Sequence, residues 1–285
     1  MRFLIISDIH GNSVALDAVL KAVPKNRYNK ILVLGDCIGD GPCPDEVINT
    51  LSKYDTIMIK GNREQLSCDY MDGTALETLN SIQWKFMRDT TKLLSDEQIN
   101  YLRQLPQTRT VSHENVDILM VHGSPFNIRE LLYIDKPERI TECLDSISQQ
   151  ILLCGHNHSQ FAYFHNCNGI EKLALNPGSV GLCQTGEAFR ADYALLEVHN
   201  GQIAFELNHT YYKGNKVKAQ FQDRNLFDGH IWGKIAYKEM SEGKLYIISF
   251  ARYVHELARR KGASTQPIPD DIWIEAEKSW DFKPV

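Results

Sequence analysis

The 285-residue sequence lacks any apolar run of the roughly 18 to 20 residues that a membrane span requires. Its first residues form a short apolar stretch that ends in a charge, without the cleavage site of a signal peptide. A basic surplus is also missing, since 31 Lys and Arg stand against 36 Asp and Glu, for a net charge of −5. We therefore expect a cytoplasmic protein with no membrane partner and no affinity for duplex nucleic acid.

Cysteines are too scattered for a disulfide framework or a paired-cysteine zinc site. There are seven, an odd number, and none belongs to a CxxC pair. This pattern favours reduced thiols. Repeats and low-complexity segments are absent too, and 43% apolar with 24% charged residues is typical of a globular protein. The composition excludes a disordered acidic chain, a collagen-like chain and a coiled coil.

The first sixty residues alternate short apolar runs with amphipathic segments. The runs at 3–7, 31–34 and 56–59 predict buried strands, and the segments at 12–23 and 45–51 predict helices. Such an alternation indicates a parallel sheet with helices packed on it.

The middle of the chain changes from helices to strands. A helical stretch is expected over about 74–105, and the segment 95–98 is a capping box for its last helix. Asn-Gly pairs at 168–169 and 200–201 then predict hairpins, so we expect a more antiparallel second sheet. Its strands are expected at 107–112, 117–121, 150–154, 160–164, 171–175, 193–198 and 202–207.

Beyond about residue 210 the pattern becomes helical again. We predict an α/β fold in which two mixed sheets face each other with helices outside them, a four-layer αββα sandwich over 1–210. Residues 211–285 would form a helical C-terminal extension, either a lid or an arm that makes a homo-oligomer. Its helices are expected at 216–222, 228–241, 244–262 and 270–280.

Short polar blocks follow five of the predicted strands. Ligands of open α/β sheets bind at the carboxyl ends of strands, so side chains distant in sequence can meet there. Carboxylates and imidazoles suit divalent transition metals such as Mn, Fe, Co or Zn. The blocks offer seven candidate ligands, which are enough for two ions that share one carboxylate. These candidates are Asp8, His10, Asp36, Asn62, His122, His156 and His158.

In this order the blocks resemble the motifs of the calcineurin-like metallophosphoesterase superfamily. Those motifs are D-x-H, G-D-x-x-x-x-G, G-N-H-[DE], a lone H, and G-H-x-H, and the resemblance covers residues 1 to 205. The chain reads Asp8-Ile-His10, Gly35-Asp36 with Gly41, Gly61-Asn62-Arg63-Glu64, His122 and Gly155-His156-Asn157-His158. Asn176-Pro-Gly-Ser179 resembles a further motif of small bacterial members.

The resemblance implies a site for two divalent transition metal ions, with Mn or Fe expected and Zn, Co or Ni as alternatives. It also implies phosphoester hydrolysis by in-line attack of a hydroxide that bridges both ions. Carried over by position, Asp8, His10 and His158 would hold the first ion, Asn62, His122 and His156 the second, and Asp36 both.

The sequence departs from the family pattern at Arg63, which stands where the family has a histidine credited with protonating the leaving oxygen. An arginine has a pKa above about 12 and cannot be a general acid, although it can stabilise phosphoryl charge. A phosphoanhydride leaves as phosphate and needs little protonation. We therefore expect Arg63 to be catalytic and to favour phosphoanhydrides or activated diesters. Asp36, which would bridge the two ions, is the other residue expected to be catalytic. The alternative is that Arg63 only pairs with Glu64 or a surface carboxylate.

A longer match at 35–44 and 122–125 resembles a bacterial and archaeal subgroup of small phosphodiesterases that includes asymmetric diadenosine tetraphosphate hydrolases. This resemblance implies a nucleotide substrate such as diadenosine tetraphosphate. A general or cyclic-nucleotide phosphodiesterase with the same metals is the alternative enzyme. A scaffold that has lost its metals is the alternative of another class, against which the complete ligand set argues.

Three further polar residues are weaker candidates for substrate binding: Asn12, Arg129 and Arg190. Asn12 is equally a helix N-cap, and Arg129 a surface residue. In the extension, the tryptophans could stack on a nucleobase or dock the tail onto the core. The basic run 259–261 is either a phosphate site or a helix end that opposes the dipole.

Overall fold

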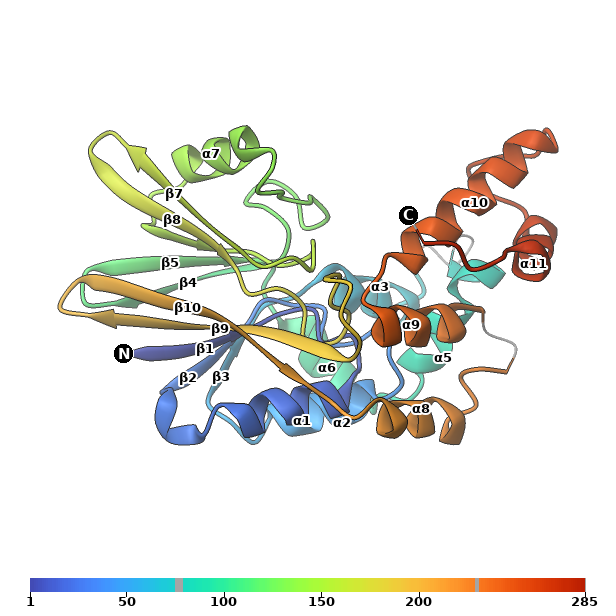
Figure 1. Ribbon diagram of the computed structural model, residues 1–285, viewed down its shortest axis with the longest axis horizontal. Coiled ribbons are helices and arrows are strands. Elements are labelled where there is room, and N and C mark those ends of the chain that lie inside the picture. Colours follow the sequence, from blue (N-terminus) through green and yellow to red (C-terminus); the bar gives the residue numbers. More distant parts are fainter. Residues whose placement is uncertain (75–78, 229–230, 285) are drawn as a thin grey trace.

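Two five-stranded sheets lie face to face in one half of the molecule, and the helices of the C-terminal extension lie in the other half (Figure 1). The computed structural model describes residues 1–74, 79–228 and 231–284. In the described part of the chain, none of the helices has both the length and the apolar character needed to cross a membrane. All seven cysteines are free thiols, as their scattered positions predicted.

The first sheet has the strand order β10-β9-β1-β2-β3. Its parallel strands β1 (Arg2–Ile6), β2 (Lys30–Val33) and β3 (Thr56–Met58) match the predicted ones. The antiparallel strands β9 (Arg190–His199) and β10 (Gln202–Tyr211) complete it, with β9 beside β1. The expectation that these two belong to the second sheet was wrong, because an Asn-Gly turn pairs two strands without saying which sheet receives them.

The second sheet has the strand order β4-β5-β6-β8-β7. Both sheets contain two parallel and two antiparallel pairs, so both are mixed, but the second is no more antiparallel than the first. The Asn-Gly hairpins occur where predicted, joining β7 to β8 and β9 to β10. The strands are β4 (Thr108–His113), β5 (Val116–Val121), β6 (Ile151–Leu153), β7 (Phe161–Cys167) and β8 (Ile170–Asn176).

Apolar side chains alternate between the two faces of β1, which fixes the layers. Phe3 and Ile5 point into the core between the sheets, where they join Ile118 and other residues of the second sheet. Leu4 and Ile6 point the other way, onto the helices α1 (Ser13–Ala22) and α2 (Pro44–Leu51). This arrangement is the predicted four-layer αββα sandwich.

The outermost layer on the second sheet is a helix that the sequence analysis did not predict, α7 (Pro137–Ser146). Its buried residues Ile140, Cys143 and Leu144 have helical spacing and pack on the outer face of the sheet. Proline in the first turn of α7 is a favourable helix start. The signal was therefore present in the sequence but short.

The expected helical stretch over 74–105 is divided into shorter helices, and residues 75–78 lie outside the described part. The capping box predicted at 95–98 is confirmed, because the side chain and main chain of Ser95 and Gln98 bond reciprocally. The elements are α3 (Asn62–Met71), the 3-10 turn η2 (Ile82–Trp84), α5 (Lys85–Thr91) and α6 (Asp96–Gln104).

The C-terminal extension has an inner and an outer half. In the inner half, Val217, Phe221 and Met240 are buried in the same apolar cluster as α1 and β1. In the outer half, Phe250, Trp273 and other residues form a separate small core. The described helices, close to the predicted ones, are α8 (Gly214–Asp223), α9 (Ile231–Glu242), α10 (Tyr246–Arg260) and α11 (Asp270–Ser279).

Candidate metal centre

The structure brings all seven predicted ligands to one edge of the sandwich, where five parallel-running strands end. Each block begins within a few residues of its strand, β1, β2, β3, β5 or β6. The first sheet thereby supplies Asp8, His10, Asp36 and Asn62, and the second supplies His122, His156 and His158. Residues from both sheets meet because the two sheets face each other with these ends on the same side.

A first group consists of Asp8, His10 and His158, whose ligand atoms lie within 4.8 Å of one another. The Nε2 atoms of His10 and His158 are 3.1 Å apart. Asp8 Oδ1 lies 3.4 Å from Nε2 of His158 and 3.7 Å from Nε2 of His10. Three donor atoms thus converge on one point.

A second group consists of Asp36, His122 and His156, again together with Asp8. His122 Nε2 lies 3.4 Å from Asp36 Oδ2 and 3.0 Å from the side-chain oxygen of Asn62. The two groups are therefore adjacent and share a carboxylate.

Each of the two aspartates, Asp8 and Asp36, has a carboxylate oxygen near histidines of the first and of the second group. Asp36 Oδ2 is also 4.0 Å from His10 Nε2, and Asp8 Oδ1 is 3.9 Å from His122 Nε2. The bridging role predicted for Asp36 is thus compatible with the geometry, and Asp8 is equally placed between the groups.

In each aspartate one oxygen is fixed by donors and the other is directed at the cluster. Asp8 Oδ2 accepts hydrogen bonds from the Ser7 hydroxyl at 2.6 Å and the His156 N–H at 2.9 Å. Asp36 Oδ1 accepts the Arg63 N–H at 2.7 Å. Asp8 Oδ1 is buried and has no hydrogen-bond partner in the described structure. A buried carboxylate oxygen without a donor fits a cation as its natural partner.

Main-chain carbonyl groups orient two of the imidazoles through Nδ1, on the side of the ring away from the cluster. Nδ1 of His122 lies 2.8 Å from the carbonyl oxygen of Leu34, and Nδ1 of His158 lies 2.8 Å from that of Leu182. An Nδ1–H that donates to a carbonyl leaves Nε2 as the free lone pair, which is the arrangement of most metal-bound histidines. The residues present therefore fit divalent transition metals.

Five of the predicted ligands have a backbone conformation that side-chain-bearing residues seldom adopt. The φ angles are +52° at Asp8, +49° at His10, +49° at Asp36, +67° at His156 and +60° at His158. Each such residue costs on the order of 1–3 kcal/mol and persists where the surroundings enforce it, typically at functional sites. The sharp turns let a strand end and still direct its next side chains at the cluster.

Glycines allow the chains to approach this closely. A Cβ at Gly61 would lie 2.3 Å from Asp36 Oδ1, and one at Gly155 would lie 2.1 Å from the Ser7 hydroxyl oxygen. Any larger residue at these two positions would push a ligand block out of place.

Mutual attraction sets the charge states of the cluster. Burial opposes ionisation of the aspartates, but the histidines outweigh it and hold the pKa of Asp8 well below its usual value and that of Asp36 at about 2. Burial likewise disfavours the charged imidazoles, yet nearby carboxylates raise the pKa of His10 to about 10 and of His122 to about 9. Burial and the charge of His122 lower the pKa of His156 to about 4.

Two acidic residues that the sequence analysis did not assign organise the site. Glu64 is buried, and its carboxylate accepts the N–H groups of Asp36, Cys37, Ile38 and Gly61 at 2.7–3.2 Å. It thereby ties the Asp36 block to the Asn62 block. The signal was a Glu at the third position of α3, the place that favours such a capping acid.

Asp40 is the second of these acids. One of its oxygens lies 3.1 Å from Nδ1 of His10 and 2.8 Å from the Arg63 guanidinium. Arg63 therefore pairs with Asp40, a carboxylate of the site, rather than with Glu64 or a surface acid, and its side chain is 20% exposed. Asp40 lies within the second block, between Asp36 and Gly41.

The three weaker candidates have other partners. Asn12 caps α1 by accepting the Ala15 N–H at 3.0 Å, and its amide also donates to the Gly181 carbonyl. Arg129 is exposed on the loop after the His122 block. Arg190 pairs with Asp192 at 2.7 Å and with Glu187. Their roles in substrate binding stay predictions.

The aromatic residues of the extension pack into a core, and its basic run ends a helix, as the second of the two alternatives for each had it. The rings of Trp232, Trp273 and Trp280 each lie 5–6.1 Å from that of Phe250, so they build the outer core. The basic run ends α10, where Lys261 pairs with a glutamate of α11.

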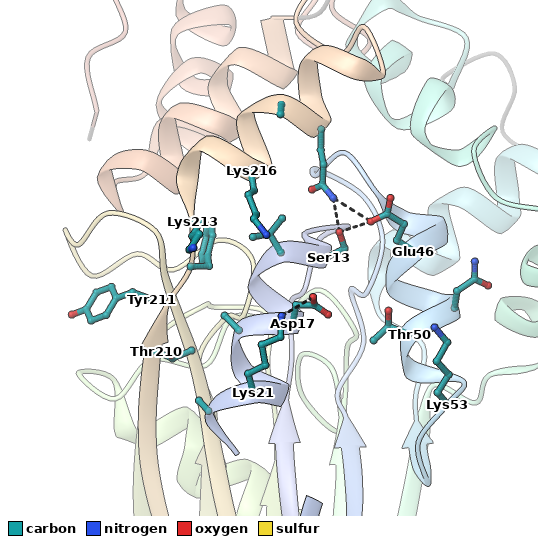
Figure 2. A pocket seen from close by; sticks show the side chains of 17 residues that line it. Ser13, Asp17, Lys21, Glu46, Thr50, Lys53, Thr210, Tyr211, Lys213 and Lys216 are labelled. Atoms are coloured by element: carbon teal, nitrogen blue, oxygen red, sulfur yellow. Dashed lines mark hydrogen bonds and ion pairs between the residues drawn. The ribbon is translucent and has the colours of Figure 1, made fainter. Parts of the chain in front are cut away.

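A groove of about 1110 Å³ lies away from the cluster, over α1, α2 and α8 (Figure 2). Its lining includes the Ser13–Glu46 hydrogen bond and Lys216, which points from α8 toward α1. None of the seven candidate ligands is among the described residues that line it. The groove is therefore separate from the candidate metal centre.

The fold and the cluster agree with the comparisons. The family model of the calcineurin-like phosphoesterase superfamily domain matches residues 1–201, so the chain belongs to the calcineurin-like phosphoesterase superfamily. The superfamily uses a dinuclear metal site, and this chain has the His/Asp cluster described above.

Individual relatives are more distant. The uncharacterized protein MJ0912 of Methanocaldococcus jannaschii is 26% identical over 214 residues, which are 70% of this chain and 84% of the relative. A metallophosphoesterase from Sphaerobacter thermophilus is 26% identical, with a TM-score of 0.67 over 85% of this chain and 99% of that one. The hypothetical protein PH1004 from Pyrococcus horikoshii OT3, 20% identical, shares the fold, with a TM-score of 0.64 over 85% and 98% of the two chains.

Proposed function

We propose that this protein is a metal-dependent hydrolase of phosphodiester or phosphoanhydride bonds in nucleotides, with dinucleoside polyphosphates such as diadenosine tetraphosphate as the substrate class. The observation that carries the hydrolase proposal is the convergence of two ligand groups on a shared carboxylate, with an unpartnered buried oxygen at Asp8. Two divalent cations bound there would polarise the phosphoryl oxygens and acidify a nearby water.

The chain's own residues have distinct roles in this proposal. Asp8, His10 and His158 would hold one cation, and Asn62, His122 and His156 the other. Asp36, whose Oδ2 lies 3.4 Å from Nε2 of His122 and 4.0 Å from that of His10, would contact both, and this is the basis of its proposed catalytic role. The histidines would act as neutral ligands, and three of them are oriented through Nδ1: His122 and His158 by carbonyl oxygens and His10 by Asp40.

Arg63 supports the substrate class. Its guanidinium is anchored by Asp40, close to His10, and the side chain is 20% exposed. A fixed positive charge that is partly accessible can bind a phosphoryl or leaving-group oxygen, but it delivers no proton. Leaving groups that depart as phosphate suit this arrangement better than alkoxides do.

A substrate panel tests the hydrolase proposal. The purified protein with added Mn²⁺ would be assayed on diadenosine tetraphosphate, cyclic nucleotides, nitrophenyl phosphodiesters and phosphomonoesters. We expect hydrolysis of the first, with Asp8→Asn at least about 100-fold slower and Asp17→Asn, an exposed acid of α1, unchanged. Preference for a cyclic nucleotide would transfer the assignment to the alternative phosphodiesterase. A protein that binds no Mn²⁺ and hydrolyses nothing would support a scaffold.

The role of Arg63 has its own test. Replacing it by histidine restores a group that can donate a proton, so Arg63→His should raise the rate on an alkyl phosphodiester relative to that on diadenosine tetraphosphate by about tenfold. Arg63→Lys keeps the charge without the proton donor and is the matched control. An equal change on both substrates in Arg63→His would contradict the proposed preference.

A further inference from the structure

The C-terminal extension contacts the loop that orients one of the candidate metal ligands. This loop, residues 177–189, follows β8 and contains Leu182, whose carbonyl oxygen lies 2.8 Å from Nδ1 of His158. The same loop holds Gln184, whose amide nitrogen lies 3.5 Å from that Nδ1 as a neighbour rather than a hydrogen-bond partner, because Nδ1–H donates to Leu182. The position of the His158 ring therefore depends on the position of the loop.

The last turn of α9 holds this loop from the opposite side. The Met240 carbonyl accepts the Phe189 N–H at 2.8 Å, and the Gly243 carbonyl accepts the Gly186 N–H at 2.9 Å. In Figure 1, α9 lies next to the loops at the end of the first sheet. Two main-chain bonds thus connect the extension to the segment behind His158.

Glu239 is the charged group at this junction. Its side chain belongs to a residue that is 1% exposed. One oxygen, Oε2, accepts the N–H groups of Tyr246 at 3.1 Å and Ile247 at 3.0 Å, at the start of α10. The other oxygen, Oε1, accepts from the Gln184 amide at 3.4 Å. A helix cap needs only the first oxygen, so the second is free to hold Gln184.

We propose that Glu239 is a positioning residue of the metal centre: it holds Gln184, and with it the loop whose Leu182 carbonyl orients His158. The inference rests on the proposed function only in that the cluster binds metal. Residues that orient a ligand histidine typically change metal affinity about 10- to 100-fold when they are replaced. The helical extension is, on this view, part of the site rather than only a lid or an oligomerisation arm.

Calorimetric Mn²⁺ binding by the full-length protein tests the proposal. Glu239→Gln and Gln184→Met should each weaken binding at one of the two sites by about tenfold or more and leave the other within about twofold. Because both substitutions cut the same connection, the double variant should be no weaker than the poorer single variant. Glu242→Gln, one turn further along α9 and paired with Lys238, is the matched control and should bind like the wild type.

Thermal unfolding of the metal-free variants separates positioning from capping. Unchanged Mn²⁺ affinity in both Glu239→Gln and Gln184→Met would overturn the proposal, whether or not the midpoint of unfolding falls. Weakened binding in Gln184→Met, which leaves the α10 cap intact, would support it even if Glu239→Gln failed to fold. Wild-type protein that binds Mn²⁺ but hydrolyses no substrate would contradict the proposed function and leave this inference standing.

Discussion

The strand-end cluster and the outer half of the extension are stabilised by opposite means. In the cluster, charged side chains are buried beside one another and five ligand residues have left-handed backbone. In the outer half, Phe250, Trp273 and Trp280 bury aromatic surface in ordinary helices. The first arrangement is costly to the fold and is kept in place by a network of acids, whereas the second stabilises the fold through apolar contacts. Strained backbone and buried charge, both of which reduce the stability of the fold, are thus concentrated at the candidate metal centre.

Removal of Glu64 should disturb the cluster most. Glu64→Gln replaces one acceptor oxygen by a donor that faces main-chain N–H groups, including those of Asp36 and Gly61. We expect the free energy of unfolding of the metal-free protein to fall by about 2–5 kcal/mol in urea denaturation, and Mn²⁺ binding to weaken strongly.

Glu97→Gln is the matched control, since Glu97 is exposed on α6, and it should change stability by less than about 0.5 kcal/mol. A Glu64→Gln protein as stable as this control would show that the four hydrogen bonds do not hold the two ligand blocks together.

Metal affinity should rise with pH. In the metal-free protein the carboxylates, despite burial, raise the pKa of His10 to about 10 and that of His122 to about 9, so both imidazoles are protonated near neutrality. Each must lose its proton to become a ligand, and affinity should increase roughly tenfold per pH unit for each proton released. Calorimetry of Mn²⁺ binding between about pH 6 and pH 8 measures this slope, and a flat profile would contradict it.

The same pKa shifts make the stability of the metal-free protein fall as the pH rises, whereas they make metal affinity increase. A raised pKa at His10 stabilises the folded state below the ordinary value of 6.5, and this stabilisation is lost as the pH rises toward 10. Metal-free protein should therefore become less stable over the range in which metal binding becomes stronger. Thermal midpoints with and without Mn²⁺ should diverge as the pH increases.

The sequence was sufficient to predict the cluster because the chemistry restricts residue types at strand ends. Asp8 and His10 follow β1 directly, and no periodicity is needed to recognise them. Sheet membership was not predictable in this way. Strands β9 and β10 are apolar enough for either sheet, and only long-range pairing with β1 assigns them. The positive φ angles of the ligands are likewise a product of the folded site.

The residues that support the candidate ligands could not be predicted from the sequence either. Glu239 lies 81 positions after His158 and reaches it only because α9 packs against the loop after β8. Asp40 lies within the second block, but its pairing with both His10 and Arg63 depends on how the ends of three strands, β1, β2 and β3, meet. A local sequence pattern can show that a residue is able to bind a metal. It does not show which distant residue will hold that ligand in position.

The smallest effect on the site is expected from the outer core of the extension. Trp273→Ala removes a buried ring that contacts those of Trp232 and Phe250, and should lower the local stability of α10 and α11 by about 3–5 kcal/mol. Hydrogen exchange at the amides of these helices would report the loss. Because Glu239 reaches the cluster through the inner half, Mn²⁺ affinity should stay within about twofold of the wild type.

Ile274→Ala, the neighbouring and 39% exposed position, is the control and should change neither measurement appreciably. If Trp273→Ala weakened Mn²⁺ binding as much as Glu239→Gln does, the outer core would have to support the site directly. The division of the extension into an inner half that serves the metal centre and an outer half that only stabilises itself would then be wrong. An unchanged affinity combined with fast exchange in α11 would place the boundary between the two halves after Glu239, at the start of α10.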